Sequence, residues 1–349
     1  MPTSLIAFTV SLIASLSLTV PVRQLALRVG MVDHPGPRKV HLTPIPLLGG
    51  LAMYCGVVLA ILVSMDGQAR AQIVGILAGA TLAALVGILD DRGLLHHQIK
   101  LFAGMPVAAL ILLVSGIHAQ VFSLRWPGRT GQLADVALTL IWVVGVTASF
   151  SIFDHMDGLC AGVAAIAAAF FTIFASMSQQ VLVSTLAAAV MGAAAGFLRW
   201  NFKPAKIFMG DGGAMFLGFL MATLGLKLRP ADSPLPTSWL VPVLILGVTI
   251  FDTTLVTISR SRRGLLPFAT PGKDHVAHRL ANLGLGQRGA VLILYGLGGL
   301  FGLLALGVSR LPVGQGYALA ALTLLAVLTA VVLLERAPYE RQQARLKSG

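Results

Sequence analysis

The stretch FLRWNFKPAKIFMGDGGAMFLG, residues 197–218, decides the fold, because it is a polar, glycine-rich segment between two long apolar runs. The runs cover about residues 181–198 and 213–228, and each approaches the length needed to cross the ~30 Å hydrocarbon core of a membrane. Charged groups beside hydrocarbon are costly and usually functional. We therefore expect this segment to hold an anionic ligand together with a metal ion. Its candidate residues are Asn201, Lys203, Lys206 and Asp211.

The composition extends this interpretation to the whole chain. Of the 349 residues, 56% are hydrophobic and 11% are charged, well below the ~25% charged share of soluble domains. The sequence predicts an all-α integral membrane protein, a polytopic bundle of about eleven transmembrane helices. The expected spans are approximately 4–22, 47–65, 71–89, 101–117, 133–150, 159–177, 181–198, 213–228, 238–258, 290–309 and 313–334.

Lys and Arg predict the orientation. With the N-terminus outside and the C-terminus inside, 19 of the 25 basic residues fall in cytoplasmic segments, as the positive-inside rule requires. The net charge of +12 is then explained by topology and anionic lipid, without nucleic acid. We expect residues 1–335 to form a single polytopic domain with cytoplasmic active-site loops, followed by a basic cytoplasmic tail at 336–349. The first run has no basic n-region or cleavage site, so a retained helix is expected.

The acidic residues also gather on one side. Of the 13 Asp and Glu residues, only Asp66, Asp135 and Asp232 are assigned to the outer side, although acids contribute little to topology. Seven of the eight histidines share the inner side. This asymmetry indicates a cytosol-facing site that handles phosphate.

The adjacent pair Asp90–Asp91 ends the third apolar run. Two neighbouring carboxylates repel, so they either share a proton or bind a cation, and Mg²⁺ with phosphate ligands is the common solution. The structural alternative is a helix C-terminal turn with Arg92 as partner. We disfavour it because carboxylates at that end oppose the helix dipole.

A second acidic element, Asp154 and Asp157, follows the fifth run. Spaced three apart, the two carboxylates share one face if the segment is helical. The alternative for Asp157 is a cap on the next helix.

Basic residues form two further candidate sites. Arg38, Lys39 and His41 lie in a proline-rich loop and either grip phosphate or serve as a positive-inside loop. His275 and His278 with Arg279 form a cationic face that suits pyrophosphate better than zinc. The neighbouring Arg260, Arg262 and Arg263 are expected to be a solvated anchor, and Asp252 is an intramembrane acid and a functional candidate.

In this order, these motifs resemble the polyprenyl-phosphate N-acetylhexosamine-1-phosphate transferases, glycosyl transferase family 4. The resemblance covers about residues 30–290. The matching elements are D-x-P-x-x-R-K-x-H from Asp33 to His41, the pair Asp90–Asp91 with Lys100, D-x-x-D-G-L from Asp154 to Leu159, N-F-x-P-A-K-I-F-M-G-D from Asn201 to Asp211, and His275 with His278–Arg279–Leu280.

The resemblance implies a reaction in a bacterial inner (plasma) membrane. UDP-GlcNAc or another UDP-amino sugar reacts with undecaprenyl phosphate to give UMP and the lipid diphosphate sugar that starts cell-envelope polysaccharide synthesis. It implies Mg²⁺, with Mn²⁺ as a substitute, on Asp211 and Asp91. Asp90 would position or deprotonate the lipid phosphate. The implied nucleotide contacts are Asp154, Asp157, Asn201 and Ser151, and the implied diphosphate or sugar contacts are Lys100, His275, His278, Arg279, Arg38, Lys39 and His41.

Some family positions differ in this chain. The usual N-x-x-N before the second acidic element is Ala148 and Ser151, and the middle histidine of the last motif is Ala277. Each change removes a nucleotide or sugar contact, while every proposed carboxylate remains. The open alternatives are a different UDP-amino sugar, an inactive paralogue that binds lipid phosphate, and a polytopic transporter. The oligomeric state also stays open, with a homodimer among the alternatives.

Overall fold

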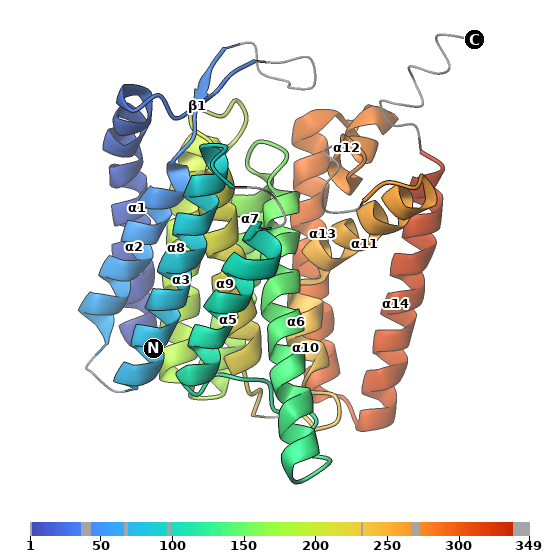
Figure 1. Cartoon of the computed structure of the whole chain (residues 1–349). Helices are drawn as coiled ribbons and strands as arrows, with labels where there is room; N and C mark the ends of the chain where they lie inside the picture. Colours follow the sequence, from blue (N-terminus) through green and yellow to red (C-terminus); the bar gives the residue numbers. More distant parts are fainter. Residues whose placement is uncertain are drawn as a thin grey trace. The chain divides into compact units, whose positions relative to one another are not determined.

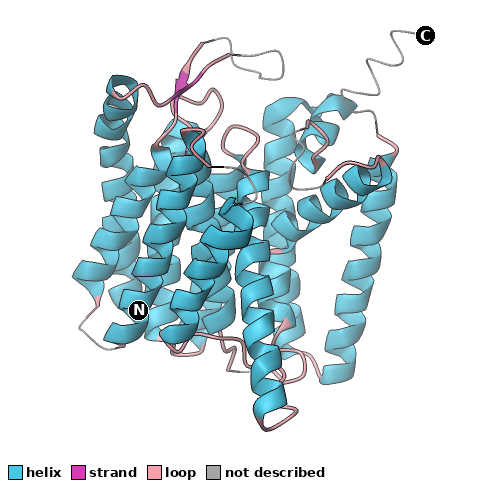
Figure 2. Ribbon diagram, in the orientation of Figure 1, coloured by secondary structure: helices cyan, strands magenta, loops and turns pink. Residues whose placement is uncertain are grey.

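The computed structural model describes residues 2–35, 43–65, 69–95, 99–231, 233–266 and 272–337 (Figure 1). The described chain is helical apart from one two-stranded ribbon, as Figure 2 shows. It divides into two compact units, Met1–Ala231 and Asp232–Gly349, which we describe separately as unit 1 and unit 2. The predicted phosphate-binding residues Arg38, Lys39 and His41 lie outside the described residues, as does the tail beyond Ala337.

Unit 1 is a bundle whose long helices run side by side in Figure 1. A π-helical turn, η1 (Lys100–Gly104), leads into α5. The antiparallel ribbon pairs β1 (Val32–Asp33) with β2 (Ile45–Pro46). The helices are α1 (Pro2–Arg28), α2 (Gly49–Ser64), α3 (Arg70–Asp91), α5 (Met105–Val114), α6 (Arg129–Phe153), α7 (Leu159–Met177), α8 (Val181–Asn201) and α9 (Gly210–Lys227).

Helix α9 forms the core of unit 1, because it packs against α2, α3, α6, α7 and α8 and is buried along nearly its whole length. Small residues make these close contacts possible. A Cβ on Gly218 would come within 2.8 Å of the Cα of Thr147 in α6, and a Cβ on Gly79 of α3 would meet the Phe219 ring at 2.3 Å. Dispersion contacts summed over such close packing hold a membrane bundle together, since lipid supplies little hydrophobic drive between helices. The result is a rigid element that carries Asp211 in its first turn.

Unit 2 contains α10 (Leu240–Ile245), α11 (Gly247–Arg262), α12 (Val276–Leu280), the π-helical turn η2 (Ala281–Leu285), α13 (Gly286–Arg310) and α14 (Val313–Glu335). Helix α11 is steeply inclined to α13 and α14 in Figure 1. The prediction of one continuous span over 238–258 is therefore wrong, because the helix breaks at Leu246. Beyond the break, α11 carries Asp252 and a basic last turn, and it is no longer an apolar segment that lipid would surround.

Among the described residues, seven helices are long and apolar enough to cross a membrane. Two more, α2 and α5, are apolar but shorter. The all-helical, multi-span prediction is confirmed, and the number of spans and their orientation stay predictions.

Candidate active site

Four elements of unit 1 bring polar side chains to one place. Asp90 lies at the end of α3, and Lys100 is the first residue of η1. Ser151 lies in the last turn of α6, and Asp211 lies in the first turn of α9. The Lys100 Nζ lies 2.6 Å from Asp90 Oδ2 and 2.8 Å from Asp211 Oδ2. The Ser151 hydroxyl donates to Asp211 Oδ1 at 2.6 Å. With Asp91, these residues form what we call the carboxylate cluster.

Asp91 joins the cluster through the main chain of α9. Its Oδ1 accepts the Asp211 N–H at 2.9 Å, and its Oδ2 accepts the Gly212 N–H at 3.1 Å. Asp91 therefore contacts the main chain of Asp211, whereas Lys100 and Ser151 contact its side chain.

The carboxylate cluster carries excess negative charge, because three carboxylates face one ammonium. Burial lowers the pKa of Lys100, but the charges and hydrogen bonds of Asp211 and Asp90 outweigh it and hold that pKa above its ordinary value, so the side chain stays an ammonium. The side chains of Asp90, Lys100 and Asp211 are 17%, 15% and 26% exposed, so a ligand can reach them. A cluster of this kind attracts a further cation.

The donor set fits Mg²⁺. Asp90, Asp211 and the Ser151 hydroxyl offer hard oxygen atoms, with no sulfur or imidazole in the cluster, and Mg²⁺ takes one or two carboxylates together with substrate phosphates. Each carboxylate oxygen has more than one lone pair, so the bonds from Lys100 and Ser151 leave coordination capacity on Asp211.

The second acidic element is a turn and does not form a helix, so the expected shared helical face is absent from residues 154–158. Asp157 Oδ2 accepts the Ala205 N–H at 3.1 Å, while α7 has Gly158 at its N-cap, so the capping alternative for Asp157 is not what the structure shows. Asn201 accepts the Gly158 N–H and donates to the Ile207 carbonyl, each at 3.0 Å. Asn201 and Asp157 thus tie two loops together.

Asp154 follows the last residue of α6 and is half-buried. Burial, together with the negative charges of Asp211, Asp91 and Asp157, raises its pKa to about 8. The excess negative charge of the carboxylate cluster thus contributes to the raised pKa of Asp154.

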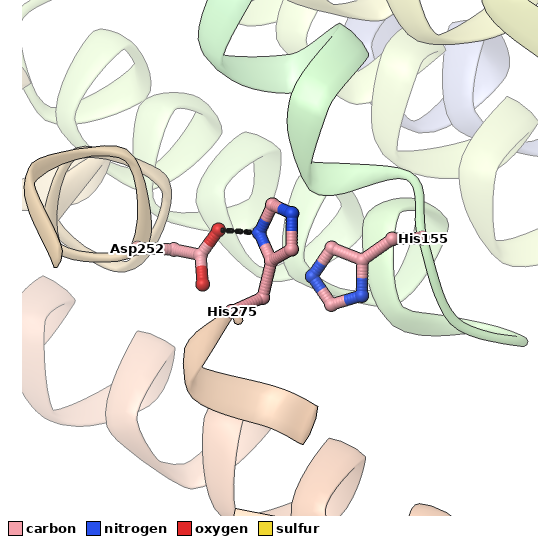
Figure 3. A group of neighbouring side chains, drawn as sticks. All are labelled: His155, Asp252 and His275. Atoms are coloured by element: carbon pink, nitrogen blue, oxygen red, sulfur yellow. Dashed lines mark hydrogen bonds and ion pairs between the residues drawn. The ribbon is translucent and has the colours of Figure 1, made fainter. Parts of the chain in front are cut away.

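In unit 2, Asp252 of α11 organises the start of α12. Its Oδ2 lies 2.7 Å from His275 Nδ1, and its Oδ1 accepts the Val276 N–H at 2.8 Å. Figure 3 shows the Asp252–His275 hydrogen bond. The Asp252 carboxylate therefore fixes the orientation of the His275 ring.

A neighbouring network in unit 2 pairs basic and acidic groups. Asp274 accepts from Arg260, whose NH2 lies 2.8 Å from Asp274 Oδ1, and it also forms an ion pair with Arg263. Burial raises the pKa of Asp274, but these hydrogen bonds and charges outweigh it and place the pKa well below its ordinary value. The expectation of a solvated basic anchor is thus wrong for Arg260 and Arg263, because an acid in the following loop pairs with both. We missed Asp274, although a lone acid shortly after three arginines was a visible signal.

Arg279 is fully buried within this network. Its guanidinium donates to the Asp274 carbonyl, the Leu334 carbonyl, the Ser259 hydroxyl and the Glu335 carboxylate. These bonds favour a structural role for Arg279 over direct contact with a diphosphate. The ring of His278 lies 6.2 Å from that of His275, centroid to centroid.

The structure thus gathers Asp90, Asp91, Lys100, Ser151 and Asp211 in unit 1, with Asp157 and Asn201 in linked loops of the same unit. It gathers His275, His278 and Arg279 in unit 2. The fold and the carboxylate cluster define a multi-span helical membrane protein in which helix ends bring together three carboxylates and one ammonium.

Sequence comparison agrees with this class. The profile of glycosyl transferase family 4 matches residues 73–229. A probable undecaprenyl-phosphate N-acetylglucosaminyl 1-phosphate transferase of Bacillus subtilis is 37% identical, over 86% of this chain and 84% of the relative. The chain therefore belongs to glycosyl transferase family 4.

Two further relatives match with similar coverage. A decaprenyl-phosphate N-acetylglucosaminephosphotransferase of Mycolicibacterium smegmatis is 31% identical, over 92% of this chain and 86% of its own length. An undecaprenyl-phosphate alpha-N-acetylglucosaminyl 1-phosphate transferase of Yersinia pestis is 26% identical, over 90% and 87%. The predicted family is confirmed, while the roles of the individual site residues stay predictions.

Proposed function

We propose that this protein transfers N-acetylglucosamine 1-phosphate from UDP-GlcNAc to undecaprenyl phosphate and releases UMP. The observation that carries this proposal is the Lys100 ammonium bound to both Asp90 and Asp211, with Ser151 on Asp211. The activities for which the relatives are named support the same donor and acceptor classes.

In this reaction a phosphate oxygen of the lipid attacks the phosphorus that carries the sugar. A new P–O bond forms, the bridging P–O bond to the uridine side breaks, and UMP leaves with the bridging oxygen. Asp90 would hold the lipid phosphate deprotonated and in line. Lys100 would stabilise the charge that develops on the diphosphate, which is the main catalytic requirement of phosphoryl transfer.

Asp211 and Asp90, with the Ser151 hydroxyl, are the groups that would hold Mg²⁺ or Mn²⁺. When bound, this cation would offset the negative charge of the diphosphate. Asp91, which we expected as a second ligand, has both oxygens engaged by main-chain amides.

The remaining predicted residues complete the proposal. Asp154, Asp157 and Asn201 would frame the nucleotide through the linked loops, and His275 and His278 would face the diphosphate or sugar. Arg279 would support them through the buried network of unit 2. Arg38, Lys39 and His41 would contribute phosphate contacts.

The proposed setting is a bacterial plasma membrane, with the N-terminus outside and the site facing the cytoplasm. The replacement of two expected carboxamides by Ala148 and Ser151 makes another UDP-amino sugar the second candidate donor.

The test is UMP release from UDP-GlcNAc by the purified protein with undecaprenyl phosphate and Mg²⁺. We expect UMP release that requires both the lipid and the cation and that Asp211→Asn abolishes. A panel of UDP-amino sugars that yields no UMP would overturn the proposal, and so would a fully active Asp211→Asn variant.

A further inference from the structure

The carboxylate of Asp91 has an unusual position for a metal ligand, because it lies directly on the N-terminus of another helix. Helix N-termini leave main-chain N–H groups without partners inside the helix. Two such groups in the first turn of α9, on Asp211 and Gly212, donate to the two separate oxygens of Asp91. Met209, at the N-cap of α9, has no side-chain oxygen that could do this. The cap is supplied from α3.

The main chain around this contact is shaped to admit it. Gly210 has a φ of +71°, and a Cβ there would lie 2.4 Å from Asp91 Oδ2. On the other side, a Cβ on Gly87 of α3 would lie 2.3 Å from the Asp211 carbonyl oxygen. Either side chain would push α3 and α9 apart, so glycine at both positions lets Asp91 reach the amides.

We propose that Asp91 is a positioning residue that caps α9 and thereby holds the main chain of Asp211, and that it is not a ligand of the metal. A carboxylate at a helix N-terminus is stabilised both by the amide bonds and by the helix dipole. The side chain of Asp211 then projects from a fixed first turn toward Lys100 and Ser151. The two adjacent acids therefore have different roles. Asp90 binds the Lys100 ammonium, and Asp91 binds the main-chain N–H of Asp211.

This inference rests on the proposed function for its kinetic consequences only. In Asp91→Asn one acceptor oxygen becomes an NH₂ donor that faces an amide donor, so half of the cap is lost. Misplacing a catalytic group by about 1 Å can cost about 10²-fold, so we expect kcat to fall by about 10- to 100-fold. The KM for UDP-GlcNAc should change much less than kcat.

Two readouts that do not depend on turnover separate positioning from ligation. The first is amide hydrogen exchange of the peptide around Asp211 and Gly212, which should lose protection in Asp91→Asn. The second is Mn²⁺ binding, measured by the electron paramagnetic resonance signal of free Mn²⁺, which should weaken less in Asp91→Asn than in Asp211→Asn.

Asp135→Asn is the matched control. Asp135 also accepts main-chain N–H groups in unit 1, those of Val121, Phe122 and Ser123. It has no part in the proposed chemistry, so its loss should lower thermal stability while kcat and the exchange of the α9 amides stay at their wild-type values. Gly210→Ala should reproduce the Asp91→Asn defect with the carboxylate still present, because it crowds the same oxygen.

The outcomes are decisive in both directions. Mn²⁺ binding lost as fully in Asp91→Asn as in Asp211→Asn would make Asp91 a ligand and overturn the inference. Wild-type exchange protection of the α9 amides in Asp91→Asn would overturn it as well. If the wild-type protein releases no UMP, the proposed function fails, but the exchange measurement still decides the role of Asp91.

Discussion

The two polar networks of this molecule differ in how their charges are balanced. In the carboxylate cluster of unit 1, the carboxylates of Asp90, Asp91 and Asp211 face one ammonium, and the side chains are partly exposed. The network of unit 2 contains as many carboxylates as guanidiniums, with Arg260 and Arg263 on Asp274, Arg279 on Glu335 and His275 on Asp252. Its ionic members are Arg260, Arg263, Arg279, Asp252, Asp274 and Glu335.

The difference assigns different work to each network. A balanced network with nearly complete burial, such as the Arg260–Asp274 pair with side chains 4% and 3% exposed, orders the structure around it. An unbalanced cluster is held in that state at a cost in stability, and such strain is typical of sites that bind a cation or substrate. Substitutions in the carboxylate cluster should therefore affect catalysis, and those that break the ion pairs of Asp274 with Arg260 and Arg263 should affect stability.

The largest effect is expected for Asp211→Asn. This change removes the carboxylate that Lys100 and Ser151 both contact and on which Mg²⁺ binding is proposed to depend. We expect UMP release to fall by about 10³-fold or more, because the charge of the diphosphate is no longer offset. The measurement is initial rate at saturating substrates, with the gel-filtration profile as a check on folding. Activity within tenfold of wild type would break the assignment of catalysis to unit 1.

The next effect is expected in unit 2, for Asp274→Asn. Both Arg260 and Arg263 lose their carboxylate partner, and breaking a buried pair by removing one member costs about 3–5 kcal/mol. The melting temperature in detergent should fall clearly, while kcat per folded molecule stays close to wild type. Arg262→Gln is the matched control, because Arg262 lies on α11, as Arg260 does, and is exposed. Loss of kcat without loss of stability in Asp274→Asn would contradict the comparison.

The sequence predicted the carboxylate cluster well, and for a physical reason. Asp90, Lys100 and Asp211 each lie at the end of an apolar run, and the alternation of spans places those ends on one side of the membrane. Charged side chains at these helix ends therefore tend to lie near one another. The family motifs pointed to the same residues.

Other features depend on geometry that spacing along the chain does not reveal. The contact between Asp91 and α9 requires Gly87 of α3 to lie close to Asp211 and Gly210 of α9 to lie close to Asp91, and glycine in an apolar run has many other uses. Arg260 and Arg263 look solvated in the sequence, and only the fold shows that Asp274 pairs with both. The break at Leu246 lies inside an uninterrupted apolar run, so hydropathy alone predicts one helix there.

A smaller effect is expected for Ser151→Ala, which tests a residue where the family pattern differs. The Ser151 hydroxyl donates to Asp211 at 2.6 Å, and a hydrogen bond to a charged group contributes about 1.5–3 kcal/mol. We expect kcat to fall by about tenfold or somewhat more, since about 1.4 kcal/mol corresponds to a factor of ten. Ser151→Thr keeps the hydroxyl and should restore most of the rate. Equal losses in both variants would show that the hydroxyl is not what matters.

The last expected effect is the pH dependence of stability that arises from Asp154. Its pKa is raised from 3.8 to about 8, first by burial and then by the negative charges of Asp211, Asp91 and Asp157, so the unfolded chain releases this proton at lower pH than the folded protein does. The folded state therefore loses stability as pH rises from about 4 to about 8, by less than about 1.4 kcal/mol per pH unit, and no further above that range.

The measurement is the melting temperature between pH 6 and pH 9 without divalent cations. This pH range includes the raised pKa of Asp154. Asp154→Asn removes the titrating group and should flatten the decline, whereas Ser151→Ala, which removes no charge, should keep the wild-type slope. Added Mg²⁺ should also flatten the wild-type decline, because a cation bound at Asp211 offsets part of the charge that raises the pKa of Asp154. An equally steep decline in Asp154→Asn would mean that the excess charge of the carboxylate cluster is not transmitted to this loop, and the contrast between the two units would then rest on catalysis alone.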